Sequence, residues 1–159
     1  MKPILAALDL SGVTDAVVSQ AAQLAAAFGS PLTLLTVLVP PVFLESYAPP
    51  PKSLARVLTS NEKAASARLA ELRDSIRARG VTASVEIVTG HPARAIADRA
   101  ATLGASHLVI GTHGHGAFYD LVVGSTTHSV LKLAPCPVLV VPARLAPRRR
   151  RSAAARLRA

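Results

Sequence analysis

The sequence predicts an α/β domain in which a parallel sheet carries helices on its faces. Short apolar runs alternate along the chain with segments of helical periodicity, and Gly or Pro residues separate them. This alternation gives five strands and four helices in the order βαβαβαβαβ. The length of 159 residues suits one domain, and a content of 50% hydrophobic residues is enough to bury a core. No internal repeat is visible, which excludes a solenoid.

The first half of the chain supplies two strands and two helices. The apolar run Ile4–Leu8 ends at Asp9, and a second run over residues 32–39 is apolar on both faces, as in a buried parallel strand. Helices are predicted over Thr14–Phe28 and over residues 53–79, and a glycine follows each of them. The first helix places four apolar side chains on one stripe, namely Val17, Ala21, Leu24 and Phe28. The five prolines of residues 40–51 lie in a long loop, which is either a functional lid or a mobile connection.

The second half supplies three strands and two helices. Residues 81–89 alternate apolar and polar side chains, which indicates an edge strand. A helix over residues 93–103 starts after a Gly-His-Pro turn, and a glycine ends it. Residues 107–110 form the fourth strand, Ser125–Leu133 the last helix and residues 137–141 the fifth strand.

The basic residues concentrate at the C-terminus. The net charge is +9, but residues 147–159 hold six arginines and no acid, so the rest has 18 − 6 = 12 basic and 9 acidic residues. We therefore expect one folded domain over residues 1–143 and a basic, disordered tail over residues 144–159. The run from Arg148 to Arg151 leaves an alternative open, in which the tail binds nucleic acid or an anionic membrane surface. The two Tyr, three Phe and no Trp argue against a dedicated single-strand binding surface.

Other sequence features bear on compartment and redox chemistry. No apolar run approaches the ~20 residues that span a bilayer, and the first run is too short for a secretory signal, so we expect a cytoplasmic protein. The single cysteine, Cys136, cannot form an internal disulfide and is expected to be a small core or interface residue. His113 and His115 lack an assured third ligand, so no metal site on the protein is predicted.

A glycine-rich loop follows the fourth strand. Gly111, Gly114 and Gly116 let backbone N–H groups approach a ligand without Cβ interference. The helix that begins after Gly124 adds free N–H groups, hydroxyls and the positive end of its dipole, which favour a phosphate. In the alternative interpretation the glycines form an ordinary loop and Ser125 only caps its helix. The chain has no GxxxxGK(S/T) string, and its first strand-to-helix turn lacks GxGxxG.

The spacing Gly111-x2-Gly114-x9-Gly124-Ser125 resembles the G-x2-G-x9-G-(S/T) motif of the ATP-binding universal stress proteins. Residues 134–142 and the placement of Asp9 are also similar to that family, and the similarity covers roughly residues 2–142. It implies a five-stranded parallel open sheet in the order 3-2-1-4-5 with helices on both faces, which is the adenine nucleotide alpha hydrolase-like fold. The order reverses between the first and fourth strands, where open α/β sheets bind ligands.

The resemblance also implies the site residues. Asp9 would lie near the adenosine and Val37 would offer backbone contacts to adenine, while a cap of the next helix is the alternative role for Asp9. The nucleotide would be lined by Ile110, Gly111, Thr112, His113 and Gly114, and its phosphates bound by Gly124, Ser125, Thr126 and Thr127. The implied cofactor is ATP, and any magnesium ion would arrive with the nucleotide. Relatives pair their last strand across a two-fold axis, which implies a homodimer through Val138–Val141.

Three functions follow from these observations. The favoured one is a regulatory stress-response module that binds an adenine nucleotide, because the glycine loop has no Lys or Arg to support fast hydrolysis and no catalytic residue is recognised. The second is a slow ATP hydrolase or phosphoryl-transfer enzyme. The third is a nucleic-acid- or membrane-associated protein that uses the arginine-rich tail.

Overall fold

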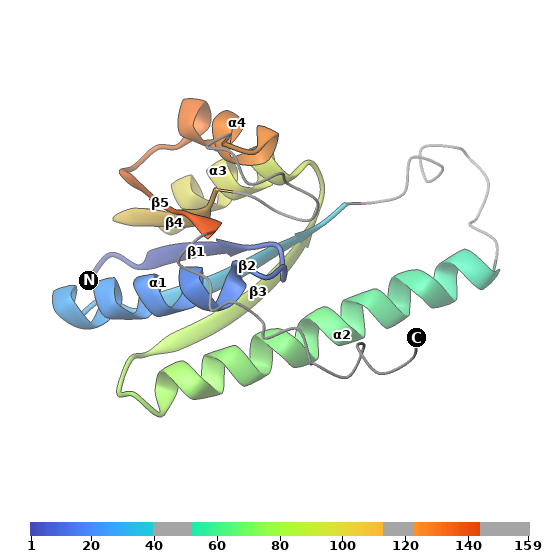
Figure 1. Ribbon diagram of the computed structural model, residues 1–159, viewed down its shortest axis with the longest axis horizontal. Helices are drawn as coiled ribbons and strands as arrows, with labels where there is room; N and C mark the ends of the chain where they lie inside the picture. Colours follow the sequence, from blue (N-terminus) through green and yellow to red (C-terminus); the bar gives the residue numbers. More distant parts are fainter. Residues whose placement is uncertain (40–51, 113–122, 144–159) are drawn as a thin grey trace, which may run out of the picture.

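The computed structural model describes residues 1–39, 52–112 and 123–143, and within these ranges strands and helices alternate (Figure 1). The strands are β1 Ile4–Leu8, β2 Leu32–Leu38, β3 Ala83–Thr89, β4 His107–Gly111 and β5 Val138–Val141. The helices are α1 Thr14–Phe28, α2 Lys52–Arg77, α3 Pro92–Leu103 and α4 Ser125–Leu133. The predicted loop over residues 40–51, the residues His113 and Gly114, and the basic tail lie outside the described residues.

The strands form one parallel sheet in the order β3-β2-β1-β4-β5, which confirms the predicted fold class and the edge position of the third strand. Helices α1 and α2 cover one face, and α3 and α4 cover the other (Figure 1). The central strand β1 pairs Ile4 with Leu32 on one side and with His107 on the other. Since β1 is fully buried, its sequence is apolar throughout.

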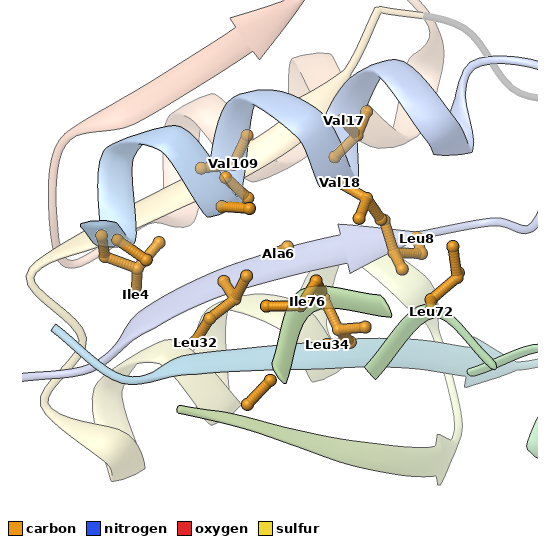
Figure 2. Close-up of a cluster of buried hydrophobic side chains, with 14 of the residues drawn as sticks. Ile4, Ala6, Leu8, Val17, Val18, Leu32, Leu34, Leu72, Ile76 and Val109 are labelled. Atoms are coloured by element: carbon orange, nitrogen blue, oxygen red, sulfur yellow. The ribbon is translucent and has the colours of Figure 1, made fainter. Parts of the chain in front are cut away.

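Two apolar clusters lie on the two sides of the sheet. On the α1 and α2 side, Leu69 and Ile76 of α2 belong to one cluster with Ile4 and Leu34 of the sheet, and all four side chains are almost completely buried. Figure 2 shows Ile76 in this cluster with Ile4 and Leu34. Each such side chain contributes roughly 1.5–3 kcal/mol when it leaves water. The other side is built from α3 and α4 against β1 and β4, and its buried residues include Ile96 and Val130.

Several predicted boundaries shift. Helix α2 begins at Lys52 rather than at residue 53 and ends at Arg77 rather than at residue 79, because residues 78–80 form a tight turn in which the Gly80 N–H donates to the Arg77 carbonyl. Strand β3 then starts at Ala83, and β2 ends at Leu38. Strand β4 extends to Gly111, which pairs with Val141.

The predicted apolar stripe of α1 is wrong at its last position. Val17 and Ala21 are buried, but Phe28 is 50% exposed and its ring stacks on His107 at 5.2 Å between centroids. The helix ends next to Gly29, whose φ of 59° is accessible to glycine at little cost and whose N–H donates to Ala25 and Ala26. Phe28 thus occupies the last turn of α1, where half of its side chain remains exposed.

Candidate functional site

The site lies at the carboxyl ends of β1 and β4, which are neighbours in the sheet. Helix α1 follows β1 in the chain and lies on one face of the sheet, whereas α4 follows β4 and lies on the other face (Figure 1). Open α/β sheets have a ligand-binding crevice at such a point, where the helices that follow two neighbouring strands lie on opposite faces. Asp9 follows the end of β1, and Gly111 ends β4.

A cavity of about 1020 Å³ occupies this crevice. Its volume is at the upper end of the ~300–1000 Å³ that small-molecule sites span. Every predicted site residue that the structure describes lines it, namely Asp9, Val37, Ile110, Gly111, Thr112, Gly124, Ser125, Thr126 and Thr127. The structure thus brings together residues that are more than one hundred positions apart in the chain, from Asp9 to Thr127.

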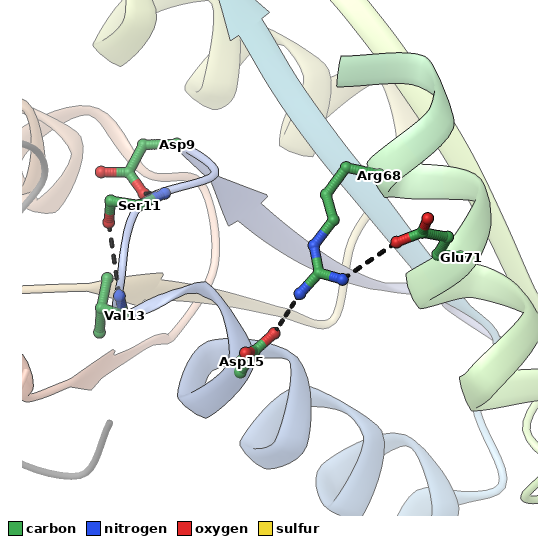
Figure 3. Close-up of polar contacts among 6 residues, drawn as sticks. All are labelled: Asp9, Ser11, Val13, Asp15, Arg68 and Glu71. Carbon is green, nitrogen blue, oxygen red and sulfur yellow. Dashed lines mark hydrogen bonds and ion pairs between the residues drawn. The ribbon is translucent and has the colours of Figure 1, made fainter. Parts of the chain in front are cut away.

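Asp9 orders the turn between β1 and α1. Its Oδ1 accepts a hydrogen bond of 3.0 Å from the Ser11 N–H, and the Ser11 hydroxyl accepts a longer one of 3.4 Å from the Val13 N–H (Figure 3). Helix α1 has no side-chain cap, so the interpretation of Asp9 as a helix cap is wrong. Leu10 adopts a φ of 58°, a left-handed conformation that is unusual for a side chain of this kind. The exposed carboxylate of Asp9 is therefore held at the cavity by the turn itself.

The start of α4 places amides at the cavity that have no acceptor within the helix. Gly124 is the N-cap, so the interpretation of Ser125 as the capping side chain is wrong. Ser125, Thr126 and Thr127 are the first three helical residues, and their N–H groups have no acceptor within the helix. The positive end of the helix dipole adds to these donors, so the arrangement suits an anion.

Thr112 holds α4 against the sheet. Its N–H donates to Val141 at 2.9 Å, and its carbonyl accepts from the Gly124 N–H at 2.7 Å. Its hydroxyl accepts from the Ala143 N–H at 3.1 Å. The ends of β4 and β5 and the start of α4 therefore meet at this one residue.

Gly111 and Thr127 have structural roles beside the predicted ones. The buried Thr127 hydroxyl donates to the Gly111 carbonyl at 2.7 Å, so its proton is already in use within the protein. A Cβ on Gly111 would lie 2.8 Å from Cγ1 of Val13, which is closer than real Cβ contacts allow. Gly111 is required where α1 approaches β4, whatever ligand the cavity binds.

Helix α2 contributes cavity residues that the sequence did not reveal. Asn61, Ala64, Ala65 and Arg68 all line the cavity from this helix. Arg68 donates to Asp15 in the first turn of α1 at 2.8 Å and to Glu71 at 3.1 Å (Figure 3). The apolar stripe through Ala65 and Leu69 identifies the buried face of α2, but nothing in the periodicity indicates which end of the sheet this helix reaches. Thr36 was also missed, and its buried hydroxyl donates to the Leu8 carbonyl at the end of β1.

Other candidate groups lie apart from the cavity. Cys136 packs against the cluster beneath α3 and α4, and its partial burial raises the pKa of the thiol. In residues 1–39, 52–112 and 123–143, no three His, Cys, Asp or Glu side chains gather as metal ligands. None of the helices in these ranges combines the length and apolarity needed to cross a bilayer.

Comparison with known proteins gives one consistent family. The model of the universal stress protein family matches residues 1–142. A universal stress protein of Mycolicibacterium smegmatis is 32% identical over 143 residues, which cover 87% of this chain and 47% of that protein. The chain matches about half or less of the length of its curated relatives.

Solved structures agree in fold. The universal stress protein UspA from Lactobacillus plantarum has a TM-score of 0.75 at 25% identity, with 88% of this chain and 97% of that one covered. A universal stress protein in complex with cAMP (TM-score 0.66, 23% identity) and one from Archaeoglobus fulgidus in complex with dAMP (0.63, 22%) each cover 89% of this chain, and 97% and 98% of their own. These neighbours share the adenine nucleotide alpha hydrolase-like fold. The chain belongs to the universal stress protein family.

Proposed function

We propose that this protein is a cytoplasmic regulatory module of the stress response that binds ATP, with little or no hydrolysis. The observation that carries the proposal is the meeting of Asp9 with the free amides of α4 in one cavity. The spacing from Gly111 through Gly114 to Gly124 and Ser125 supports ATP as the ligand. The cAMP and dAMP complexes of two structural neighbours support an adenine nucleotide in general.

Different lining residues of the cavity match the ribose, the adenine and the phosphates of the nucleotide. Asp9 accepts a ribose hydroxyl, and the backbone at Val37 contacts the adenine edge. The phosphates bind the amides of Ser125 and Thr126 and the Ser125 hydroxyl, together with the loop that contains His113 and Gly114. Thr127 holds Gly111 in place, and it contacts a phosphate only if its bond to the Gly111 carbonyl is exchanged.

The chemistry of the described walls favours binding over hydrolysis. Among the described lining residues, Asp9 and Arg68 are the charged side chains, so these walls offer one positive side chain and no further Lys, Arg or His beside it. Phosphoryl transfer needs a positioned nucleophile and positive charge on the transferring group. Bound ATP therefore acts as a signal that changes the surface presented to a partner.

Nucleotide binding is tested first by mass spectrometry of small molecules released from freshly purified protein. Calorimetry with ATP, ADP, AMP and cAMP then ranks the ligands. Ser125→Ala is expected to weaken ATP binding by at least about 10-fold, since a hydrogen bond to a charged group contributes ~1.5–3 kcal/mol and ~1.4 kcal/mol corresponds to tenfold in affinity. The exposed Ser66 of α2 does not line the cavity, so Ser66→Ala is the matched control. The proposal fails if none of these compounds binds. If the wild-type protein releases phosphate in a single turnover and Ser125→Ala does not, the protein is a slow hydrolase instead.

We propose further that two copies pair along β5. This strand is at the edge of the sheet, and Leu139 on it is 38% exposed, while Leu131 and Leu133 of the preceding helix are each 47% exposed. Leu139→Lys is expected to give a monomer in light scattering, and an unchanged dimer would contradict the proposal. Val140 is less suitable for this test because it packs against the core.

The tail is proposed to be separable from the nucleotide-binding domain of residues 1–143. Removal of residues 144–159 is expected to leave ATP binding unchanged. If the tail binds nucleic acid or an anionic membrane, the same truncation abolishes that binding and its salt dependence.

A further inference from the structure

The wall of the cavity between α1 and α2 has polar groups that the proposed nucleotide contacts do not use. Asn61 and Arg68 of α2 lie on this wall, and Thr14 lies on it from the first turn of α1. Helices α1 and α2 cover the face of the sheet opposite to α4 (Figure 1). These groups therefore line the cavity on the side opposite to the amides of Ser125 and Thr126.

Arg68 is the one basic side chain among the described residues that line the cavity. Its Nη2 donates to Asp15 and its Nη1 to Glu71, so these bonds use two of its five N–H donors (Figure 3). The Arg68 side chain is 45% exposed, and the side chains of Asp15 and Glu71 are 56% and 68% exposed. Ion pairs so open to water contribute little to stability, so a ligand can replace one carboxylate at small cost.

Thr14 is the second observation on this wall. It is 3% exposed, and its Oγ1 has no hydrogen-bond partner within the described ranges. Buried hydroxyls are nearly always hydrogen-bonded, since an unmade bond costs free energy. The hydroxyl next to Asp15 is thus a polar group that a ligand can satisfy.

We propose that Arg68 and Thr14 form a second anion subsite of the cavity, which binds the outer phosphates of the nucleotide, and that Asp15 occupies Arg68 in the ligand-free protein. This proposal rests on the proposed nucleotide binding. It also explains why the cavity would prefer nucleotides with more phosphates. The amides of α4 bind the first phosphate, and each further phosphate increases the affinity through its contact with the Arg68 guanidinium. Asp15 acts as an internal competitor for the same guanidinium.

The test is a double-mutant cycle on Arg68 and Asp15, with adenosine, AMP, ADP and ATP as titrants in calorimetry. Arg68→Gln is expected to weaken ATP binding about 10-fold and to leave adenosine within twofold. Asp15→Asn is expected to tighten ATP binding a few-fold, but to have no such effect when Arg68 is already Gln. Arg73→Gln and Asp74→Asn are the matched controls, since this ion pair lies on the same helix and does not line the cavity.

A second variant separates ligand contact from fold. Thr14→Val keeps the side-chain shape, so the ligand-free protein is expected to melt at the same or a higher temperature while ATP binding weakens several-fold. A lower melting temperature with unchanged affinity overturns the role of Thr14. The subsite as a whole is overturned if Arg68→Gln leaves the ATP affinity unchanged, or if Asp15→Asn tightens binding equally in the Arg68→Gln background. Wild-type protein that binds none of the four compounds, adenosine included, instead refutes the proposed function and the subsite with it.

Discussion

The close approach of α1 to β4 makes Gly111→Ala the most direct test of the packing at the site. The added Cβ would lie 2.8 Å from Cγ1 of Val13, and 3.4 Å from both Cγ2 of Val13 and Cγ2 of Val17. Carbon atoms pack at ~3.5–4.0 Å, so α1 has to move away from the sheet or Val13 has to leave its rotamer. Such overpacking typically costs 1–3 kcal/mol, which lowers the melting temperature of a chain of this length by roughly 2–12 °C.

Urea denaturation of the ligand-free protein, followed by circular dichroism, measures this cost. Gly12→Ala is the control, because a Cβ at Gly12 meets no atom within 4 Å. In a Val13→Ala background the clash is removed, so Gly111→Ala is expected to cost little there, with a coupling energy of about 1–3 kcal/mol. The reasoning is refuted if Gly111→Ala is as stable as the control, or if Val13→Ala does not relieve it. A loss of ATP affinity in Gly111→Ala would, by itself, not identify a phosphate contact.

Three further substitutions or reactions test other parts of the fold. Leu69→Ala removes a side chain that is 0% exposed and is expected to cost about 2–5 kcal/mol in urea denaturation; a cost below about 1 kcal/mol would contradict the assigned core. Glu86→Gln removes the charge and one of the two acceptors that Arg99 contacts and is expected to cost about 1 kcal/mol, whereas Asp98→Asn, in an ion pair with Arg94 whose side chains are largely exposed, should change stability by less than about 0.5 kcal/mol. Because burial raises the pKa of Cys136, less of its thiol is ionised at neutral pH, so alkylation should be slower than that of a free thiol and should accelerate as the pH rises; equal rates at neutral pH would contradict this.

The elements were predictable from the sequence because burial dictates their composition. Ile4–Leu8 is apolar at every position since both faces of β1 are covered, and residues 81–89 alternate since β3 is at the edge. The stripe on α1 failed at Phe28 because periodicity describes the helix but not where the sheet beneath it ends. Strand order followed from the family resemblance, since local patterns carry no information about which strands are neighbours.

The site was predictable where it depends on the chain near the strand ends. Asp9, Gly111 and the start of α4 are marked by residue type and spacing, and all of them reach the cavity. Arg68 was not predictable, because in the sequence it is one of several charged residues on an amphipathic helix. Only the packing of α2 against the sheet brings it to the cavity. The same holds for Thr14, because the lack of a hydrogen-bond partner for its hydroxyl among the described residues depends on its surroundings.

The hydrogen bonds of Thr112 make the cavity and the outer edge of the sheet mechanically dependent on each other. One residue, Thr112, joins the N-cap of α4, through its carbonyl and Gly124, to the last residue of β5, through its N–H and Val141. A shift of the first turn of α4 by even a fraction of an ångström must stretch these bonds or carry the end of β5 along. A ligand that displaces the first turn of α4 is therefore expected to displace the end of β5 as well.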